Sequence, residues 1–92
     1  MVKPVKVASL RIGDVEDVGI YAGFAIAEWE KTETSQALKR LNVAPTMWRS
    51  SGDPVSYGVV IDLWCEEYDP EDMAMARLCG LINEDRRVNI KI

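Results

Sequence analysis

Histidine is absent from the 92 residues of the chain. It is the side chain whose unperturbed pKa lies near neutrality, it is the general base of Ser–His–Asp and Cys–His sites, and it supplies ligands in HExxH zinc sites. Sites of these types are therefore excluded. The two cysteines, Cys65 and Cys79, stand fourteen positions apart without a CxxC pair, which argues against a disulfide framework. We expect both to be buried free thiols.

Long hydrophobic runs are also missing. The longest, residues 18–27, contains Gly19 and Gly23 and is far shorter than the ~20 apolar residues that a spanning helix needs. The first residues, MVKPVK, lack the apolar segment of a signal peptide. We therefore expect a cytosolic protein, or one of the host cytosol if it is virus-encoded, with no membrane partner. The length and the lack of a linker predict a single domain over residues 1–92.

The composition is that of a globular domain, 48% hydrophobic and 28% charged. Alternating or β-branched segments predict four strands, at residues 5–12, 46–50, 56–65 and 86–92. The first changes phase near Ala8, which indicates a β-bulge. A turn is predicted at 51–54, from its glycine and proline. The inward residues of the two later strands would be Val59, Ile61, Leu63, Cys65, Val88, Ile90 and Ile92.

Residues 18–30 fit two structures. As a helix, they are apolar on nearly all sides, contain two glycines that each cost about 1 kcal/mol relative to alanine, and could be capped by Asp14. As a strand, they alternate regularly. The alternation and the glycines favour the strand, and its apolar face would then consist of Val18, Ile20, Ala22, Phe24 and Ile26.

Two helices have clear start signals. Thr32 is a typical N-cap, and its helix ends before Pro45, because the residue before proline avoids the α region. Its inward residues would be Thr34, Ala37, Leu38 and Leu41. The second helix starts with Asp69 as N-cap and Pro70 at its first position, and it would end at Asn83. Its buried stripe would consist of Ala74, Met75, Leu78, Leu81 and Ile82.

Together these segments predict an α+β domain with a mainly antiparallel sheet of four to five strands and two helices on one face. If residues 18–30 form a strand, the order of elements is ββαββαβ. If they form a helix, the order is the ferredoxin-like βαββαβ. The fold class does not depend on that choice.

Charge is distributed unevenly along the chain. There are 15 acidic and 11 basic residues, for a net charge of −4, but residues 53–85 alone hold nine acidic residues and one basic residue. Part of this acidity is explained by the predicted helix start at Asp69, since carboxylates stabilise the positive end of a helix dipole. The candidate partner-binding surface adds neighbouring aromatic residues and comprises Asp62, Trp64, Glu66, Glu67, Tyr68, Asp69, Glu71 and Asp72.

Such a surface has several interpretations. It could complement a basic protein, imitate the spaced phosphates of a nucleic acid, hold a divalent cation, or be a solvated surface without a partner. The spacing does not match an EF-hand loop. An exposed Trp64 beside carboxylates favours the protein partner, because tryptophan is enriched among residues that dominate binding energies.

Other functions have weaker support. Nucleic-acid-binding domains normally carry a basic stripe, so direct nucleic-acid binding is disfavoured in this acidic chain. A nucleic-acid-associated subunit remains an alternative if the first and last strands are neighbours, which would bring together Lys6, Arg11, Arg87 and Lys91. The segment 50–53 lacks the patterns of a P-loop and of a nucleophile elbow. A small enzyme or divalent-metal protein is the third alternative, and we predict no catalytic, metal or cofactor residues.

The leading hypothesis is a small non-enzymatic interaction or regulatory protein that docks a basic partner through the acidic surface. No segment carries a family signature. In general character the short acidic chain resembles virus-encoded inhibitors and small regulators. Nucleic-acid mimicry would allow such a protein to block a host nucleic-acid-binding complex.

Overall fold

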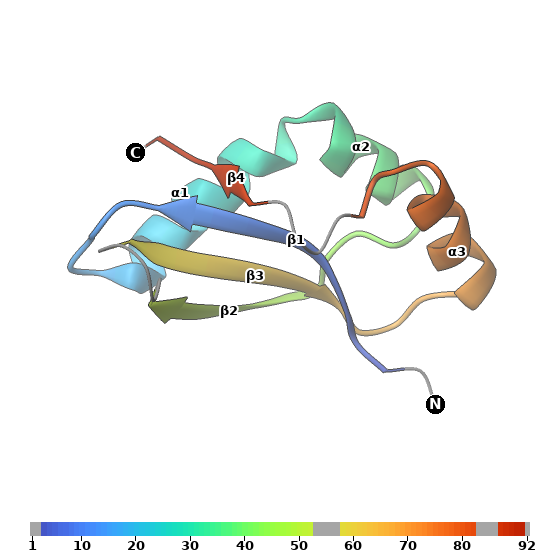
Figure 1. Ribbon diagram of the computed structural model, residues 1–92, viewed down its shortest axis with the longest axis horizontal. Coiled ribbons are helices and arrows are strands. Elements are labelled where there is room, and N and C mark those ends of the chain that lie inside the picture. The colour runs from blue at the N-terminus through green and yellow to red at the C-terminus, as the bar shows by residue number, and fades with distance from the viewer. Residues whose placement is uncertain (1–2, 53–57, 83–86, 92) are drawn as a thin grey trace.

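The computed structural model describes residues 3–52, 58–82 and 87–91. Its order of elements, βααββαβ, confirms the α+β class and agrees with the ferredoxin-like alternative, with one additional helix (Figure 1). The elements are β1 (Val5–Ile12), α1 (Val18–Glu30), α2 (Glu33–Arg40), β2 (Met47–Gly52), β3 (Val59–Cys65), α3 (Pro70–Leu78) and β4 (Val88–Asn89).

The strands form one sheet in the order β2-β3-β1-β4. β1 and β2 each pair with β3 in antiparallel orientation, as predicted, whereas β4 pairs with β1 in parallel. A helix that crossed back over the sheet after β3 would make β4 parallel to β3. Instead, α3 lies at the end of the sheet where β3 leaves it, so the chain starts β4 from that same end (Figure 1).

Residues 18–30 form the helix α1, so the favoured strand prediction is wrong and its helical alternative is right. The N-cap is Asp17 and not Asp14, because the Asp17 carboxylate accepts a 3.1 Å hydrogen bond from the Ile20 N–H. The regular alternation was misleading because the helix also has apolar residues on its outer side, where Ile20 and Phe24 are exposed. Its buried residues lie at helical spacing: Ala22, Ala25 and Trp29.

The core lies between the sheet and the helices α1 and α2. The predicted inward face of β3 is confirmed for Ile61, Leu63 and Cys65, which are all buried, while Val59 is half-buried. In β1, the pairing register shifts between Lys6 and Ala8, next to the predicted bulge. The extra residue allows side chains on both sides of the shift to reach the core, and those that do are Val7, Leu10 and Ile12.

The predicted N-cap Thr32 connects α1 to α2. Its Oγ1 accepts a hydrogen bond from the Ser35 N–H at 3.2 Å and donates one to the Trp29 carbonyl at 2.7 Å. One hydroxyl therefore starts α2 and joins it to the last turn of α1. Leu38 is buried as predicted, whereas Thr34 is exposed.

The start of α3 is confirmed, but its length and buried face are not. The helix ends at Leu78, and Gly80 follows with φ of 72°, a left-handed conformation that glycine tolerates. Its buried residues are Met73 and Ala76, one turn apart. Three residues of the predicted stripe are exposed instead: Ala74, Met75 and Leu78. The predicted end at Asn83 lies outside the described residues.

The remaining strand boundaries differ modestly from the prediction. β2 continues to Gly52, into the expected turn, and positions 53–54 of that turn lie outside the described residues. The last strand is reduced to Val88–Asn89, since it has a short pairing with β1. Val88 is exposed and Ile90 half-buried, so the predicted inward face is only partly formed; positions 86 and 92 are not described.

Candidate functional site

The predicted acidic surface is divided by the fold into two groups. Asp62 and Trp64 alternate with the buried residues of β3 and therefore lie on the sheet face away from the core. The remaining six residues follow β3, in the loop that leads into α3 and in the first turn of that helix. Asp62 is about 13 Å along the strand from Glu66 at 3.3 Å per residue. The structure thus places the eight residues in two groups, one on a face of the sheet and one beyond the end of β3.

Asp62 takes part in the packing of the sheet. It pairs in register with Ser9 on β1 and Arg49 on β2, and its Oδ1 accepts a 2.8 Å hydrogen bond from the Ser9 hydroxyl. Ser9 is 3% exposed, so this bond satisfies a buried polar group. Asp62 accordingly has a structural partner and is a weak candidate for contact with another protein.

Trp64 was expected to be an exposed anchor, but it is half-buried. It pairs in register with Lys6 and Met47. Its indole Nε1 is buried and has no hydrogen-bond partner within the described part of the chain. Of the other tryptophans, Trp29 is buried and Trp48 is 41% exposed, so Trp48 and not Trp64 is the tryptophan most open to solvent.

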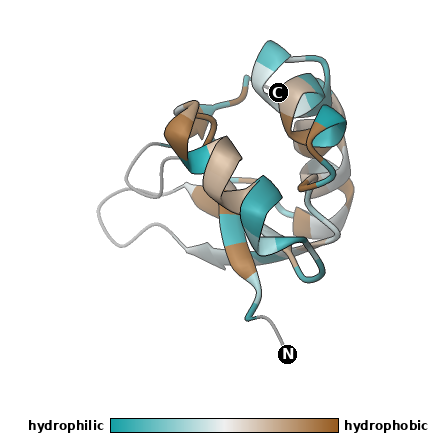
Figure 2. Cartoon of the chain, turned by 90° about the vertical axis from the view of Figure 1, so that its right-hand side faces the viewer, coloured by the Kyte–Doolittle hydropathy of each residue, from teal (hydrophilic) through white to brown (hydrophobic). Residues whose placement is uncertain are grey.

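Five carboxylates gather where β3 leads into α3, and we call this group the acidic end: Glu66, Glu67, Asp69, Glu71 and Asp72. Figure 2 looks onto this end of the molecule, where hydrophilic turns of helix face the viewer. All five are exposed except Asp72, which is half-buried. Within residues 3–52, 58–82 and 87–91, the only ion pair that the structure shows is Lys31–Glu28, at 2.8 Å, and it lies on α1.

Two carboxylates of the acidic end have local structural roles. Asp69 caps α3 by accepting a 2.9 Å hydrogen bond from the Glu71 N–H. Glu66 accepts a 3.0 Å hydrogen bond from the Thr46 hydroxyl, whose oxygen in turn accepts one from the Glu66 N–H at 3.2 Å. Glu67, Glu71 and Asp72 make no such side-chain bonds in the described structure, and their charges are available to a partner.

Tyr68 and Cys65 hold the loop of the acidic end in place. The Tyr68 hydroxyl donates a 2.7 Å hydrogen bond to the Lys3 carbonyl, so the tyrosine fixes the segment that precedes β1. The Cys65 thiol lies 3.3 Å from the Glu67 carbonyl, and burial raises its pKa above the ordinary value of 9.0. Cys65 is thus the buried free thiol that was predicted, whereas Cys79 is exposed, which contradicts the prediction.

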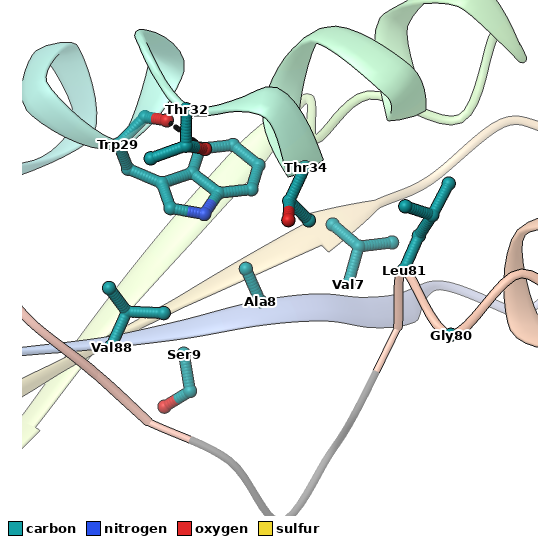
Figure 3. Close-up of a pocket in the computed structure, with 9 residues that line it drawn as sticks. All are labelled: Val7, Ala8, Ser9, Trp29, Thr32, Thr34, Gly80, Leu81 and Val88. Carbon is teal, nitrogen blue, oxygen red and sulfur yellow. Dashed lines mark hydrogen bonds between the residues drawn. The ribbon is translucent and has the colours of Figure 1, made fainter.

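A cleft of about 210 Å³ opens between the end of α1 and the sheet (Figure 3). Trp29 and Thr32 border it on the helix side, Val7 lies on the sheet, and Leu81 lies on the segment that follows α3. The described lining residues include no acid, base or thiol, and the Thr32 hydroxyl is already bonded to the Trp29 carbonyl. No group of three or more possible metal ligands occurs in the described residues either.

The condition for the nucleic-acid alternative is met in part. β4 lies beside β1, with Arg11 opposite Asn89, so basic residues of both termini share this edge of the sheet. Lys91 is exposed and Lys6 half-buried. Arg11 and Arg87 both have partners within the protein.

The outer side of α1 is an apolar surface that lies outside the predicted candidate surface. Four residues at helical spacing are exposed there, and we call them the outer stripe: Ile20, Gly23, Phe24 and Ala27. The signal was present in the sequence, because residues 18–30 are apolar on nearly all sides. The same residues also alternate regularly, and this alternation favours a strand.

Comparison with known proteins adds no relative: no family model, no curated protein and no solved structure matches the chain. Among the described helices, none is both long enough and apolar enough to cross a membrane.

Proposed function

We propose that the protein is a non-enzymatic interaction domain that docks a basic protein partner through the acidic end. The observation that carries this proposal is the gathering of five carboxylates where β3 meets α3, with Glu67, Glu71 and Asp72 free of ion pairs in the described structure. Surface carboxylates without ion pairs raise the rate of association with a positively charged partner, and they disfavour binding of acidic proteins.

A narrower form of the proposal is nucleic-acid mimicry, in which the carboxylates occupy the phosphate-binding positions of a nucleic-acid-binding complex. Competition with a nucleic acid distinguishes mimicry from docking elsewhere on a basic protein. A mimic competes with DNA or RNA for its partner, whereas a domain that binds elsewhere on a basic protein does not.

The test compares two single charge reversals. Glu71→Lys reverses one charge of the acidic end, and Glu33→Lys is the control. Both variants change the net charge equally, both residues are exposed, and both occupy the first turn of a helix. The loss of helix-dipole stabilisation is therefore matched.

A basic partner is first identified by co-purification with the wild-type domain from cells of its source, and its affinity for the variants is then measured by calorimetry. We expect the acidic-end variant to lose at least about tenfold in affinity, since close charge pairs at interfaces are coupled, while the control stays near the wild-type value. Equal affinities for the two variants would contradict the proposal.

A second candidate function is a nucleic-acid-associated subunit, and the adjacency of β1 and β4 favours it. In that case RNA or DNA binding at low salt should fall steeply as salt increases. Absence of binding at low salt removes this candidate.

A further inference from the structure

The helix α1 carries apolar residues on two opposite sides. Ala22, Ala25 and Trp29 are buried against the core. On the other side, the outer stripe repeats at i, i+3, i+4 and i+7, and Ile20 and Phe24 are 57% and 58% exposed. A helix that is apolar all round is normally buried on all sides. The outer stripe therefore lacks the cover that its composition would require in a free-standing domain.

The stripe has the shape of a docking surface. The rings of Tyr21 and Phe24 lie 6.4 Å apart at 55° and border a shallow hollow of about 520 Å³, together with Ile20. Next to Phe24 on the stripe is Gly23, where an added Cβ would meet nothing within 4 Å. Packing within the chain therefore does not require a glycine at this exposed helical position, although glycine is unfavourable in helices. A neighbouring backbone could approach closely there.

The rim of the hollow is acidic. Asp14, Glu16 and Asp17 all contribute to its lining, and all three are exposed. At the other end of α1, Glu28 forms an ion pair with Lys31 at 2.8 Å. Glu30 forms no ion pair within the described part of the chain, so its negative charge is not compensated. Both ends of the stripe thus present negative charge.

This charge distribution indicates which kind of partner the outer stripe can bind. A second copy in antiparallel orientation would place the acidic N-terminal end of one α1 against Glu30 of the other, and a parallel copy would bring the acidic ends together, so self-pairing is repulsive. An anionic membrane surface would be repelled for the same reason. An apolar helix with basic residues at its borders satisfies both the stripe and the rim.

We propose that the outer stripe of α1 is a second docking site, and that it binds an amphipathic helix whose apolar stripe is bordered by lysine or arginine. The site is separate from the acidic end, because α1 starts at the end of the molecule opposite to α3 (Figure 1). The two sites can therefore be lost independently.

The probe is a synthetic helix of about 18 residues, or about five turns, with leucine at i, i+3, i+4 and i+7 and lysines at the borders. A second peptide has glutamate in place of each lysine. Binding to the full chain is measured by fluorescence anisotropy for three proteins: wild type, Phe24→Ser, and Leu78→Ser as control. Leu78 is a large apolar residue of α3 that is 84% exposed, so its replacement removes comparable surface apolarity elsewhere. Circular dichroism of each variant verifies the fold.

We expect the basic peptide to bind the wild type and Leu78→Ser alike, and to bind Phe24→Ser about tenfold or more weakly, as for loss of an aromatic anchor. The acidic peptide should not bind. Equal affinity of the basic peptide for all three proteins, or no binding at all, overturns the proposal. A concentration-dependent dimer that Phe24→Ser abolishes in sedimentation also overturns it, because the occupant is then a second copy.

Discussion

Among the six glycines of the chain, Gly58 is the one where an added methyl group would meet the closest neighbours. It is buried at the start of β3, beside the end of β1. A Cβ there would lie 2.9 Å from the Ile12 carbonyl oxygen and 2.9 Å from Nη2 of Arg11. The arginine side chain can move aside, but the carbonyl belongs to the backbone of β1. Gly58→Ala therefore has to shift one strand against the other.

The size of the effect follows from two opposing terms. Overpacking of this kind costs typically about 1–3 kcal/mol, and the reduced entropy of the unfolded chain returns about 0.4–1 kcal/mol. We expect a net loss of about 1–2 kcal/mol, which lowers Tm by roughly 5–15 °C in a domain of this size. Gly13→Ala is the matched control, since its Cβ meets nothing within 4 Å and it should be neutral or slightly stabilising.

Urea unfolding followed by tryptophan fluorescence measures both variants, and an unchanged m-value verifies that the denatured state is comparable. If Gly58→Ala is as stable as Gly13→Ala, the close approach of β1 to residue 58 is refuted.

Four further predictions concern the core, a helix cap and the thiols. Leu38→Ala should destabilise the domain by about 2–5 kcal/mol, because Leu38 is fully buried; Leu78→Ala should change stability by less than about 0.5 kcal/mol, and equal losses in urea would contradict the core assignment. Asp69→Ala should lower the free energy of unfolding by about 1 kcal/mol through loss of the cap on α3, whereas Asp69→Asn should keep most of the stabilisation by the cap. If both variants are as stable as wild type in urea, the cap does not stabilise the domain. Cys79 should react with a thiol reagent in the native state and Cys65 only on unfolding, so equal rates would disprove the difference in burial. Because burial raises the pKa of Cys65, its contribution to stability is complete below the unfolded-state pKa near 9.0 and decreases above it, and Cys65→Ala should lessen the decline at high pH.

Sequence signals of local chemistry predicted the structure well. Thr32 and Asp69 cap the helices that they were expected to cap, because a side-chain oxygen just before a helix can accept a hydrogen bond from a free N–H of the first turn. The inward residues of β3 were also predicted, because a buried strand shows a period of two.

The errors have separate physical causes. In α1, the outer stripe made a helix look like a strand, because a second apolar side removes the polar half that identifies an amphipathic helix. In α3, the helix ends at Leu78, so two residues of the predicted stripe, Leu81 and Ile82, lie beyond it, and the side that packs on the core carries Met73 and Ala76. The candidate surface was divided because residues close in sequence lie on a strand face and beyond the end of that strand, which charge alone does not reveal.

The short pairing of β4 with β1 determines which part of the sheet opens first. β1 and β3 are aligned over seven residue pairs, whereas β1 and β4 are aligned over two, followed by one hydrogen bond from the Ile90 N–H to the Arg11 carbonyl at 2.9 Å. Segments with few backbone bonds open at a lower free energy than the whole domain. Amide hydrogens of β4 should therefore exchange with solvent through local detachment, long before those of β1 and β3. Detachment of β4 would turn β1 into an edge strand and would leave a three-stranded sheet of β2, β3 and β1.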